Sequence, residues 1–237
     1  ALAVENRLPA TKLEIGFTPV LVNTGKELIL FDTGNGEGTR PARGNLRPGL
    51  AAAGYSPEDV DIVVITHMHP DHIGGIMEGG KPAYPNATYV TAAAEYDFWS
   101  KGEEGNRVAD MVRGSLVPLA EKIRFIKPGD SVVSGIEALD ASGHTPGQLA
   151  FHIESEGKRL VLIADVANHF VVALQRPDWH VRFDMDKDKA VATRKSILGM
   201  IAADGVPFTG YHMPFPAMGW LTPKGPGFEF VPATYQF

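Results

Sequence analysis

Hydrophobic and polar residues follow one another in short periodic runs, which predict a mixed α and β protein. Short apolar, β-branched runs bounded by Gly, Pro, Asn or Asp are typical of strands. The predicted strands span 11–24, 27–32, 61–66, 87–91, 122–126, 131–133, 135–139, 148–154, 159–164 and 206–211. Apolar residues at helical spacing predict helices over 46–53, 73–78, 92–100, 108–121 and 186–204. Strand-rich and helix-rich stretches alternate twice, so we expect two packed mixed sheets with helices outside them.

Composition then narrows the classes of protein and of site. The 237 residues are 44% hydrophobic and 21% charged, which suits a globular domain with a sizeable core. No run of about 18 apolar residues occurs, so no membrane span is expected. The net charge of −6 argues against a broad nucleic-acid surface. Because the chain has no cysteine, any metal must be held by His, Asp and Glu.

A cluster of potential metal ligands follows the predicted strand 61–66. Four of them fall within six residues: His67, His69, Asp71 and His72. Such a hexapeptide should arise by chance in roughly one chain in ten thousand of this length. Alternate side chains of extended backbone share a face, so His67 and His69 can bind one ion while Asp71 and His72, beyond Pro70, point to a neighbouring position. One loop can therefore supply ligands to two metals.

Three further residues at the ends of predicted strands could complete such sites: His144, Asp165 and His212. A second carboxylate is needed to bridge two cations about 3.5 to 4 Å apart, because they repel each other. Asp165, which closes the apolar run before it, suits that role. A lone His or Asp is more often a satisfied buried group or a turn residue. Five histidines and two aspartates in this arrangement favour the metal site.

The set resembles the metallo-β-lactamase superfamily, whose ligands follow the order HxHxDH, His, bridging Asp, His. The resemblance spans Phe31 to His212 and implies an αββα sandwich in a single domain over 1–237. It implies that one metal is held by His67, His69, His144 and Asp165. The other would be held by Asp71, His72, His212 and Asp165. The expected cofactor is two divalent metal ions, Zn before Mn, Fe or Co.

The same resemblance assigns one further polar residue and two aromatic residues. Asp32, in Phe31-Asp32-Thr33-Gly34, resembles the family's aspartate that orients the ligands, and a turn cap is the alternative. Trp99 is the pocket aromatic that the resemblance places best, and Phe215 could form a wall of the entrance in a Pro- and Gly-rich loop. Packing in the core is the alternative for Trp99, and packing of its loop onto the sheet is the alternative for Phe215.

Within the superfamily, Asp at 165 together with His72 resembles the binuclear esterase, lactonase and phosphodiesterase branches rather than the zinc β-lactamases. Only 25 residues follow His212, which disfavours the helical C-terminal domain of glyoxalase II. The motifs THMHPDHIGG, GHTPGQ and GYHMPFP are similar to those of methyl parathion hydrolase and its lactonase or arylesterase relatives. Compared with these the chain is short at its front, so an opening hairpin is absent or lies outside this sequence.

We therefore expect a metallo-hydrolase in which a hydroxide shared by two ions attacks an ester, lactone or organophosphate. Asp165 and Asp71 are the predicted catalytic residues: Asp165 bridges the ions, and Asp71 or a bound water protonates the leaving group. An iron-dependent oxidoreductase similar to persulfide dioxygenases is the alternative. A non-catalytic module with this fold is the third hypothesis.

The expected partner is a small-molecule substrate, with neither nucleic acid nor a membrane, and a homodimer is left open. The chain begins Ala1-Leu2-Ala3 without Met. This indicates a processed or omitted leader and favours a periplasmic or secreted protein over a cytoplasmic one.

Overall fold

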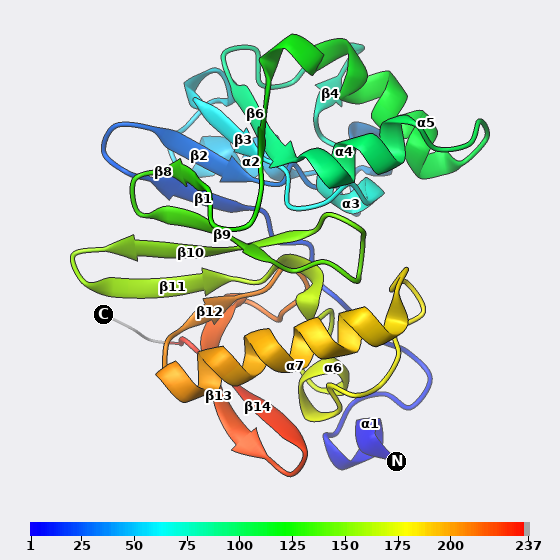
Figure 1. The fold of residues 1–237 in the computed structure, drawn as a ribbon, viewed down its shortest axis with the longest axis vertical. Coiled ribbons are helices and arrows are strands. Elements are labelled where there is room, and N and C mark those ends of the chain that lie inside the picture. Colours follow the sequence, from blue (N-terminus) through cyan, green and yellow to red (C-terminus); the bar gives the residue numbers. More distant parts are fainter. Residues whose placement is uncertain (235–237) are drawn as a thin grey trace. The chain divides into compact units, whose positions relative to one another are not determined.

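The computed structural model describes residues 1–234 and divides into two compact units (Figure 1). The β1–β7 unit comprises residues 19–127. The β8–β14 unit comprises residues 1–18 together with the chain from residue 128 onwards. Each unit contains one large mixed sheet and its own helices. No helix within the described part of the chain is both long and apolar enough to cross a membrane.

The sheet of the β1–β7 unit has the strand order β1-β2-β3-β6-β7. Its strands are β1 (Val20–Asn23), β2 (Leu28–Phe31), β3 (Ile62–Val64), β6 (Thr88–Ala92) and β7 (Ile123–Ile126). β1 pairs antiparallel with β2, and the other neighbours are parallel. The short strands β4 (Met77–Glu78) and β5 (Lys81–Pro82) form a separate hairpin. The helices are α2 (Leu46–Ala52), α3 (Pro70–Ile73), α4 (Ala93–Ser100) and α5 (Arg107–Ser115).

One face of this sheet packs against the helices of the same unit. Leu28 and Leu30 of β2 and Val63 of β3 occupy alternate positions and are buried, as a strand with one face on a core requires. They pack in one cluster with Trp99 of α4 and Val112 of α5. This core holds the ends of β2 and β3 rigid, and both strands lead directly into polar loops.

The β8–β14 unit has a seven-stranded sheet in the order β14-β13-β12-β11-β10-β9-β8. Its strands are β8 (Ser131–Val133), β9 (Ile136–Asp140), β10 (Leu149–Ser155), β11 (Lys158–Leu162), β12 (Phe208–Thr209), β13 (Met218–Lys224) and β14 (Gly227–Pro232). Only β11 and β12 run parallel among these pairs of described strands. The helices are α1 (Leu2–Glu5), α6 (Val172–Gln175) and α7 (Lys187–Asp204).

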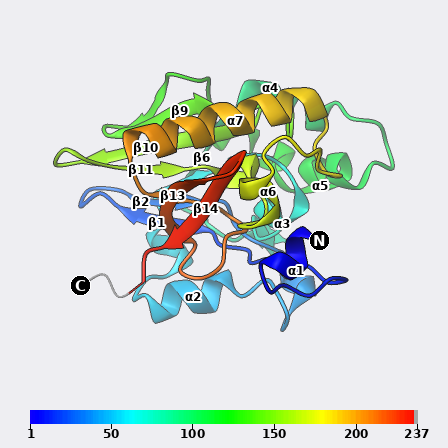
Figure 2. The same cartoon turned by 90° about the horizontal axis from the view of Figure 1, so that it is seen from below.

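Helix α7 lies along this sheet (Figures 1 and 2) and has clear start and stop residues. The Asp186 carboxylate accepts the N–H of Lys189 at 3.0 Å, which caps the first turn. Gly205 ends the helix in the left-handed conformation at φ +63°. Ile197 and Ile201, one turn apart, are buried on the sheet side. The predicted helix over 186–204 is thus confirmed.

Other elements differ from the sequence-based expectation, for local reasons. The helix predicted over 73–78 is wrong, because Pro70 begins a single turn, α3, and Met77–Glu78 form a strand instead. The strand predicted from residue 11 begins only at Val20. The helix predicted over 108–121 ends at Ser115, and a 3₁₀ helix follows over Val117–Lys122.

The segment after His212 was interpreted as a Pro- and Gly-rich loop, and the structure shows the strands β13 and β14 there. Gly219 lies where a Cβ atom would stand 2.2 Å from the Val231 carbonyl oxygen of β14. Its small size therefore allows the two strands to approach. The expectation of a single domain over 1–237 stays a prediction.

Candidate metal centre

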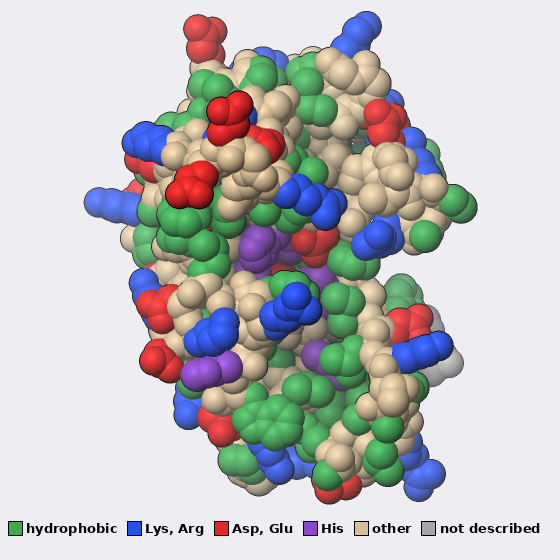
Figure 3. All heavy atoms as spheres, turned by 90° about the vertical axis from the view of Figure 1, so that its right-hand side faces the viewer, with side chains coloured by type: hydrophobic (Ala, Val, Ile, Leu, Met, Phe, Trp, Pro, Cys, Tyr) green, Lys and Arg blue, Asp and Glu red, His purple; other side chains and the backbone are tan. Residues whose placement is uncertain are grey.

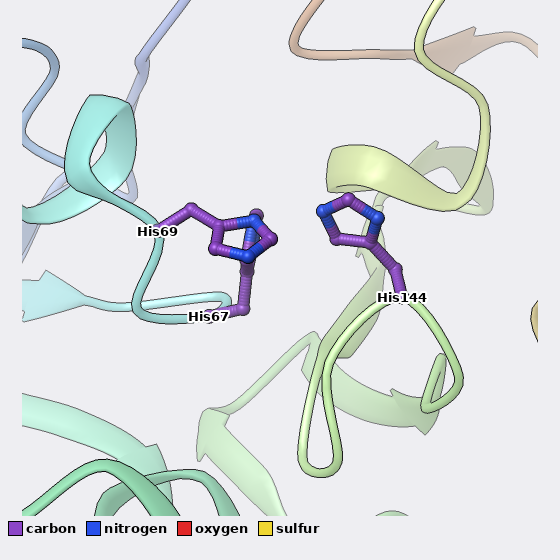
Figure 4. Close-up of side chains that lie close together, drawn as sticks. All are labelled: His67, His69 and His144. Carbon is purple, nitrogen blue, oxygen red and sulfur yellow. The ribbon is translucent and has the colours of Figure 1, made fainter. Parts of the chain in front are cut away.

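The four predicted ligands of the HxHxDH motif lie on the loop and helical turn that follow β3. His67 and His72 are buried and His69 is half-buried, and the rings of His67 and His72 lie 3.9 Å apart between centroids. His67 Nε2 lies 3.1 Å from His69 Nδ1. Figure 4 draws His67 and His69 on this loop. Helix α3 carries Asp71, whose carboxylate lies 3.7 Å from His72 Nε2. The β1–β7 unit therefore gathers one of the two sets of ligands.

Asp32, to which the resemblance assigns an orienting role, contacts this loop, and that role stays a prediction. It follows β2 with its backbone in the left-handed region at φ +60°, which Asp tolerates better than most residues. One carboxylate oxygen accepts the N–H of Thr66 at 2.8 Å. The other accepts the Thr66 hydroxyl at 2.8 Å and His72 Nδ1–H at 2.7 Å. Burial raises the pKa of Asp32, and the bonds from His72 and Thr66 oppose that rise.

The ring protons of two imidazoles in this unit, those of His67 and His72, are placed by their hydrogen-bond partners. A carboxylate accepts only, so His72 donates from Nδ1 to Asp32. The Thr66 hydroxyl already donates to Asp32, so its lone pairs accept Nδ1–H of His67 at 3.2 Å. Both rings therefore carry a lone pair on Nε2, the form in which imidazole binds a metal.

Glu95 of helix α4 is hydrogen-bonded to the loop that carries the candidate ligands. The sequence did not indicate a role for this residue. This fully buried carboxylate accepts the N–H of Met68 at 2.9 Å and the indole N–H of Trp99 at 2.8 Å. Trp99 is itself buried in the core cluster, and its ring lies 6.1 Å from that of His69. Trp99 thus packs in the core beside a predicted ligand, and its role in a substrate pocket stays a prediction.

The other three predicted ligands lie at strand ends of the β8–β14 unit. His144 lies on the loop between β9 and β10, as Figure 4 shows, and His212 follows β12. Asp165 lies in the 3₁₀ turn Ala164–Val166 after β11. One of its carboxylate oxygens is 3.0 Å from Nε2 of His212 and 3.4 Å from Nε2 of His144. All three side chains are buried, so this unit gathers the second set of ligands.

Two acceptors, of which Asp184 is buried, also fix the tautomers of these two histidines. His144 Nδ1 donates to Asp184 at 2.8 Å, and His212 Nδ1 donates to the Gly16 carbonyl oxygen at 2.8 Å. Asp184 is held in turn by the buried Arg194 at 2.8 Å. Burial disfavours the charged form of Asp184, but the bond from His144 and the charge of Arg194 outweigh it and lower the pKa of Asp184.

The sequence did not point to Asp184 or Gly16. Asp184 lies 40 residues from His144, among acidic residues just before α7. From the sequence alone, an acidic residue at this place indicates the start of a helix rather than a partner of a metal ligand. Gly16 contributes a backbone oxygen, which no residue pattern reveals.

The donor chemistry suits metal ions. With Nδ1 protonated on His144 and His212, both Nε2 atoms present lone pairs toward an oxygen of Asp165. Lone pairs at such distances repel unless a cation or a proton lies between them. Imidazole Nε2 held from behind by a carboxylate or a carbonyl, next to carboxylate oxygens, is the usual environment of Zn²⁺ and related ions. The candidate metal ligands of the β1–β7 unit are His67, His69, Asp71 and His72, and those of the β8–β14 unit are His144, Asp165 and His212.

Phe215, the second predicted pocket aromatic, lies between β12 and β13. Its side chain is 96% exposed, and it borders a cavity of the β8–β14 unit. Its side chain therefore does not pack the loop onto the sheet, which is the alternative for this residue. Its contact with a substrate stays a prediction.

The fold and these ligands define a class of protein that comparison with known families identifies. Residues 18–202 match the family described as the Metallo-beta-lactamase superfamily, and the chain belongs to it. The predicted fold class, mixed sheets flanked by helices in the metallo-β-lactamase fold, is confirmed.

More particular similarities are to lactonases and hydrolases. An N-acyl homoserine lactonase of Bacillus cereus is 30% identical over 168 residues, which cover 66% of this chain and 62% of that protein. The matched part thus spans less than two thirds of that relative's length. The structure of AidC, described as a dizinc quorum-quenching lactonase, has a TM-score of 0.91 at 28% identity and covers 100% of this chain and 85% of AidC. The structure of the hydrolase AbOPH has a TM-score of 0.90 at 27% identity and covers 100% of this chain and 86% of AbOPH.

Proposed function

We propose that this chain is a metal-dependent hydrolase that opens lactones or cleaves related esters. The observation that carries the proposal is the fixed tautomer of four histidines. His67, His72, His144 and His212 each donate Nδ1–H to an oxygen within their own unit, which leaves Nε2 in its metal-binding form. Neutral imidazoles that present Nε2 lone pairs near carboxylate oxygens are the donors that a metal site requires.

The cofactor in this proposal is a pair of divalent cations, with Zn²⁺ the first candidate. The donor set supports it, because imidazole and carboxylate without cysteine suit Zn²⁺, Mn²⁺, Fe²⁺ or Co²⁺. The description of AidC as a dizinc enzyme supports it as well. We assign one ion to His67, His69, His144 and Asp165, and the other to Asp71, His72, His212 and Asp165.

The chemistry of such a pair is hydrolytic. Two bound cations would lower the pKa of a bound water to near neutrality and would polarise a substrate carbonyl. Asp165 supplies the carboxylate that offsets the repulsion between two cations. Asp71, whose carboxylate is about a quarter exposed, can hold a proton and deliver it to the leaving alkoxide. Asp32 and Asp184 keep His72 and His144 in position while charge develops.

The relatives support a choice of substrates to test. The named similar proteins are hydrolases, two of them lactonases, which favours hydrolysis over the iron-dependent oxidation that the sequence left as an alternative. N-acyl homoserine lactones are therefore the first substrates to test. Aryl esters and organophosphates complete the panel.

The test is turnover of this panel by protein that is stripped with a chelator and then reloaded with Zn²⁺, Mn²⁺, Fe²⁺ or Co²⁺. We expect lactone opening that disappears with the metal and returns with it. His144→Ala should abolish turnover. His180→Ala, at an exposed histidine paired with Asp188, should retain it. Absence of metal-dependent turnover on every substrate would overturn the proposal.

A further inference from the structure

A cavity in the β8–β14 unit adjoins the ligand His212. Its volume is about 810 Å³, within the range of about 300–1,000 Å³ that is usual for small-molecule sites. Gly16, which accepts the Nδ1 hydrogen of His212, lines this cavity. So does Phe17, whose ring lies 5.5 Å from the His212 ring. The cavity therefore begins directly behind one of the metal ligands.

The cavity wall is largely apolar. Its hydrophobic lining includes Leu13, Ile15, Phe17, Phe170, Met213 and Phe215. Leu13, Ile15 and Phe215 are exposed in the structure, and Figure 3 shows hydrophobic side chains gathered on the lower part of the face that it draws. Such a wall suits a hydrocarbon arm rather than a charged ligand. Lys12 and Glu14 also line the cavity, but both side chains are exposed to solvent. Their charged groups are therefore not buried in the cavity.

His169 is the buried polar side chain of this wall, and its protonation is fixed. Its Nδ1 atom accepts the N–H groups of Val171 at 3.1 Å and Val172 at 3.2 Å, where helix α6 begins. An atom that accepts two N–H groups carries no hydrogen, so the hydrogen is on Nε2. The ring stacks on Phe170, which holds its plane at 18° to that ring. Burial lowers the pKa of His169 and so favours this neutral form.

Among residues 1–234 no acceptor is bonded to that Nε2 hydrogen, although the side chain is only 5% exposed. The Nε2 atom is not among the fully buried side-chain atoms that lack a partner, so it reaches the cavity, where water or a ligand can accept its hydrogen. The ring therefore presents one oriented donor to a largely apolar cavity.

We propose that His169 is a specificity-determining residue: its Nε2–H donates to the amide carbonyl oxygen of an acyl arm that occupies this cavity. The inference rests on the proposed function and extends it, because it selects lactones that bear an N-acyl chain from lactones that bear a plain alkyl chain. The ring is already held through Nδ1 and by stacking on Phe170, so its Nε2 donor loses little entropy on binding, which makes it an effective selector.

Two substitutions separate this role from the support that His169 gives to helix α6. His169→Asn keeps an oxygen near the position of Nδ1, which can still accept the Val171 and Val172 N–H groups, but it removes the Nε2 donor. His169→Gln places an amide N–H near the position of Nε2 but loses the acceptor beside the helix. His169→Asn therefore removes the donor to the substrate, and His169→Gln removes the acceptor that supports helix α6.

The experiment compares KM and kcat for an N-acyl homoserine lactone and for a γ-lactone with an alkyl chain of equal length but no amide. For His169→Asn we expect KM to rise about five- to tenfold on the first substrate and to stay unchanged on the second, with kcat within about twofold on both. His169→Gln should restore most of the preference while lowering Tm. If His169→Asn kept the preference for the N-acyl substrate and His169→Gln lost it, the inference would be overturned. An equal rise of KM on both substrates would overturn it as well.

Binding of the ring-opened N-acyl homoserine, measured by calorimetry, gives a readout that does not need turnover. We expect a five- to tenfold weaker Kd for His169→Asn than for the wild type. If the wild type opens neither lactone, the proposed function fails, and the calorimetric ratio alone then decides the role of His169. An unchanged Kd would contradict that role.

Discussion

Each of four predicted ligand histidines has its Nδ1 hydrogen held by an oxygen of its own unit: a hydroxyl, two carboxylates and a backbone carbonyl. The ligand rings are thus oriented before any ion binds. Since ordering a side chain costs entropy, rings fixed in advance increase metal affinity. The residues that provide this order are as much a part of the site as the ligands.

Asp32 tests this point in the β1–β7 unit. Asp32→Asn keeps the shape of the side chain but removes the charge that accepts His72 Nδ1–H. We expect metal affinity to fall about 10- to 100-fold, measured by competition with a chromogenic chelator. Asp59→Asn, at a surface carboxylate bonded to Ser56 in the same unit, is the matched control and should leave affinity unchanged. Equal affinities for the two variants would contradict the orienting role of Asp32.

Glu95 supports the ligand loop in a different way, by accepting two buried N–H groups. Glu95→Ala leaves the Met68 amide and the Trp99 indole without this acceptor. It should lower the free energy of unfolding by about 2–4 kcal/mol in a denaturant titration. Glu95→Gln keeps an acceptor oxygen and should cost about 1 kcal/mol or less. If both variants lose the same stability, the hydrogen bonds do not explain the burial of Glu95.

At this scale the sequence points to the candidate ligands but not to the residues that hydrogen-bond to them. His67, His69, Asp71 and His72 stand within one hexapeptide, so spacing alone indicates a metal site. Asp184, Glu95 and Gly16 reach the ligands only through the fold, at separations that no local pattern encodes. Asp32 was found through the resemblance to a family, not through its spacing.

At the scale of the elements, the loop that carries His144 is shaped by close packing on helix α7. Gly143 has φ +130°, and a Cβ atom there would lie 2.4 Å from the backbone nitrogen of Ala190. Only glycine satisfies both conditions. The start of α7 thus determines the path of the loop that presents His144.

Gly143→Ala should therefore destabilise the fold by about 2–4 kcal/mol, measured by chemical denaturation. Gly157→Ala is the matched control, because Gly157 also has a positive φ, +72°, but its Cβ would meet nothing within 4 Å. It should cost about 1 kcal/mol, the strain of the backbone alone. Similar losses for the two variants would mean that contact with α7 does not constrain this loop.

The predicted helices and strands agree with the structure where a periodic hydrophobic pattern extends over many residues. They differ where a single residue decides the local conformation. Helix α7 extends over 18 residues with clear caps, and it was predicted to within one residue. At Pro70 one residue shifts the start of a helical turn, and α3 is only four residues long. β13 contains Gly219 and Pro223, which concealed its alternation.

At the scale of the whole molecule, each unit gathers its own set of proposed metal ligands, four in the β1–β7 unit and three in the β8–β14 unit. Ions that bind only the folded chain stabilise it, by about 2.7 kcal/mol when their concentration is a hundred times Kd. Removal of the metal with a chelator should therefore lower Tm, and addition of Zn²⁺ should restore it. A Tm that does not respond to chelator would contradict the predicted link between metal binding and folding.

The most direct test of the central claim is the metal content of the purified, folded chain, measured by elemental analysis. The account predicts two divalent ions per chain for the wild type and for His180→Ala, and a loss of bound metal for His67→Ala and His144→Ala. A folded wild type that retains no ion, or ligand variants that retain both ions, would contradict it.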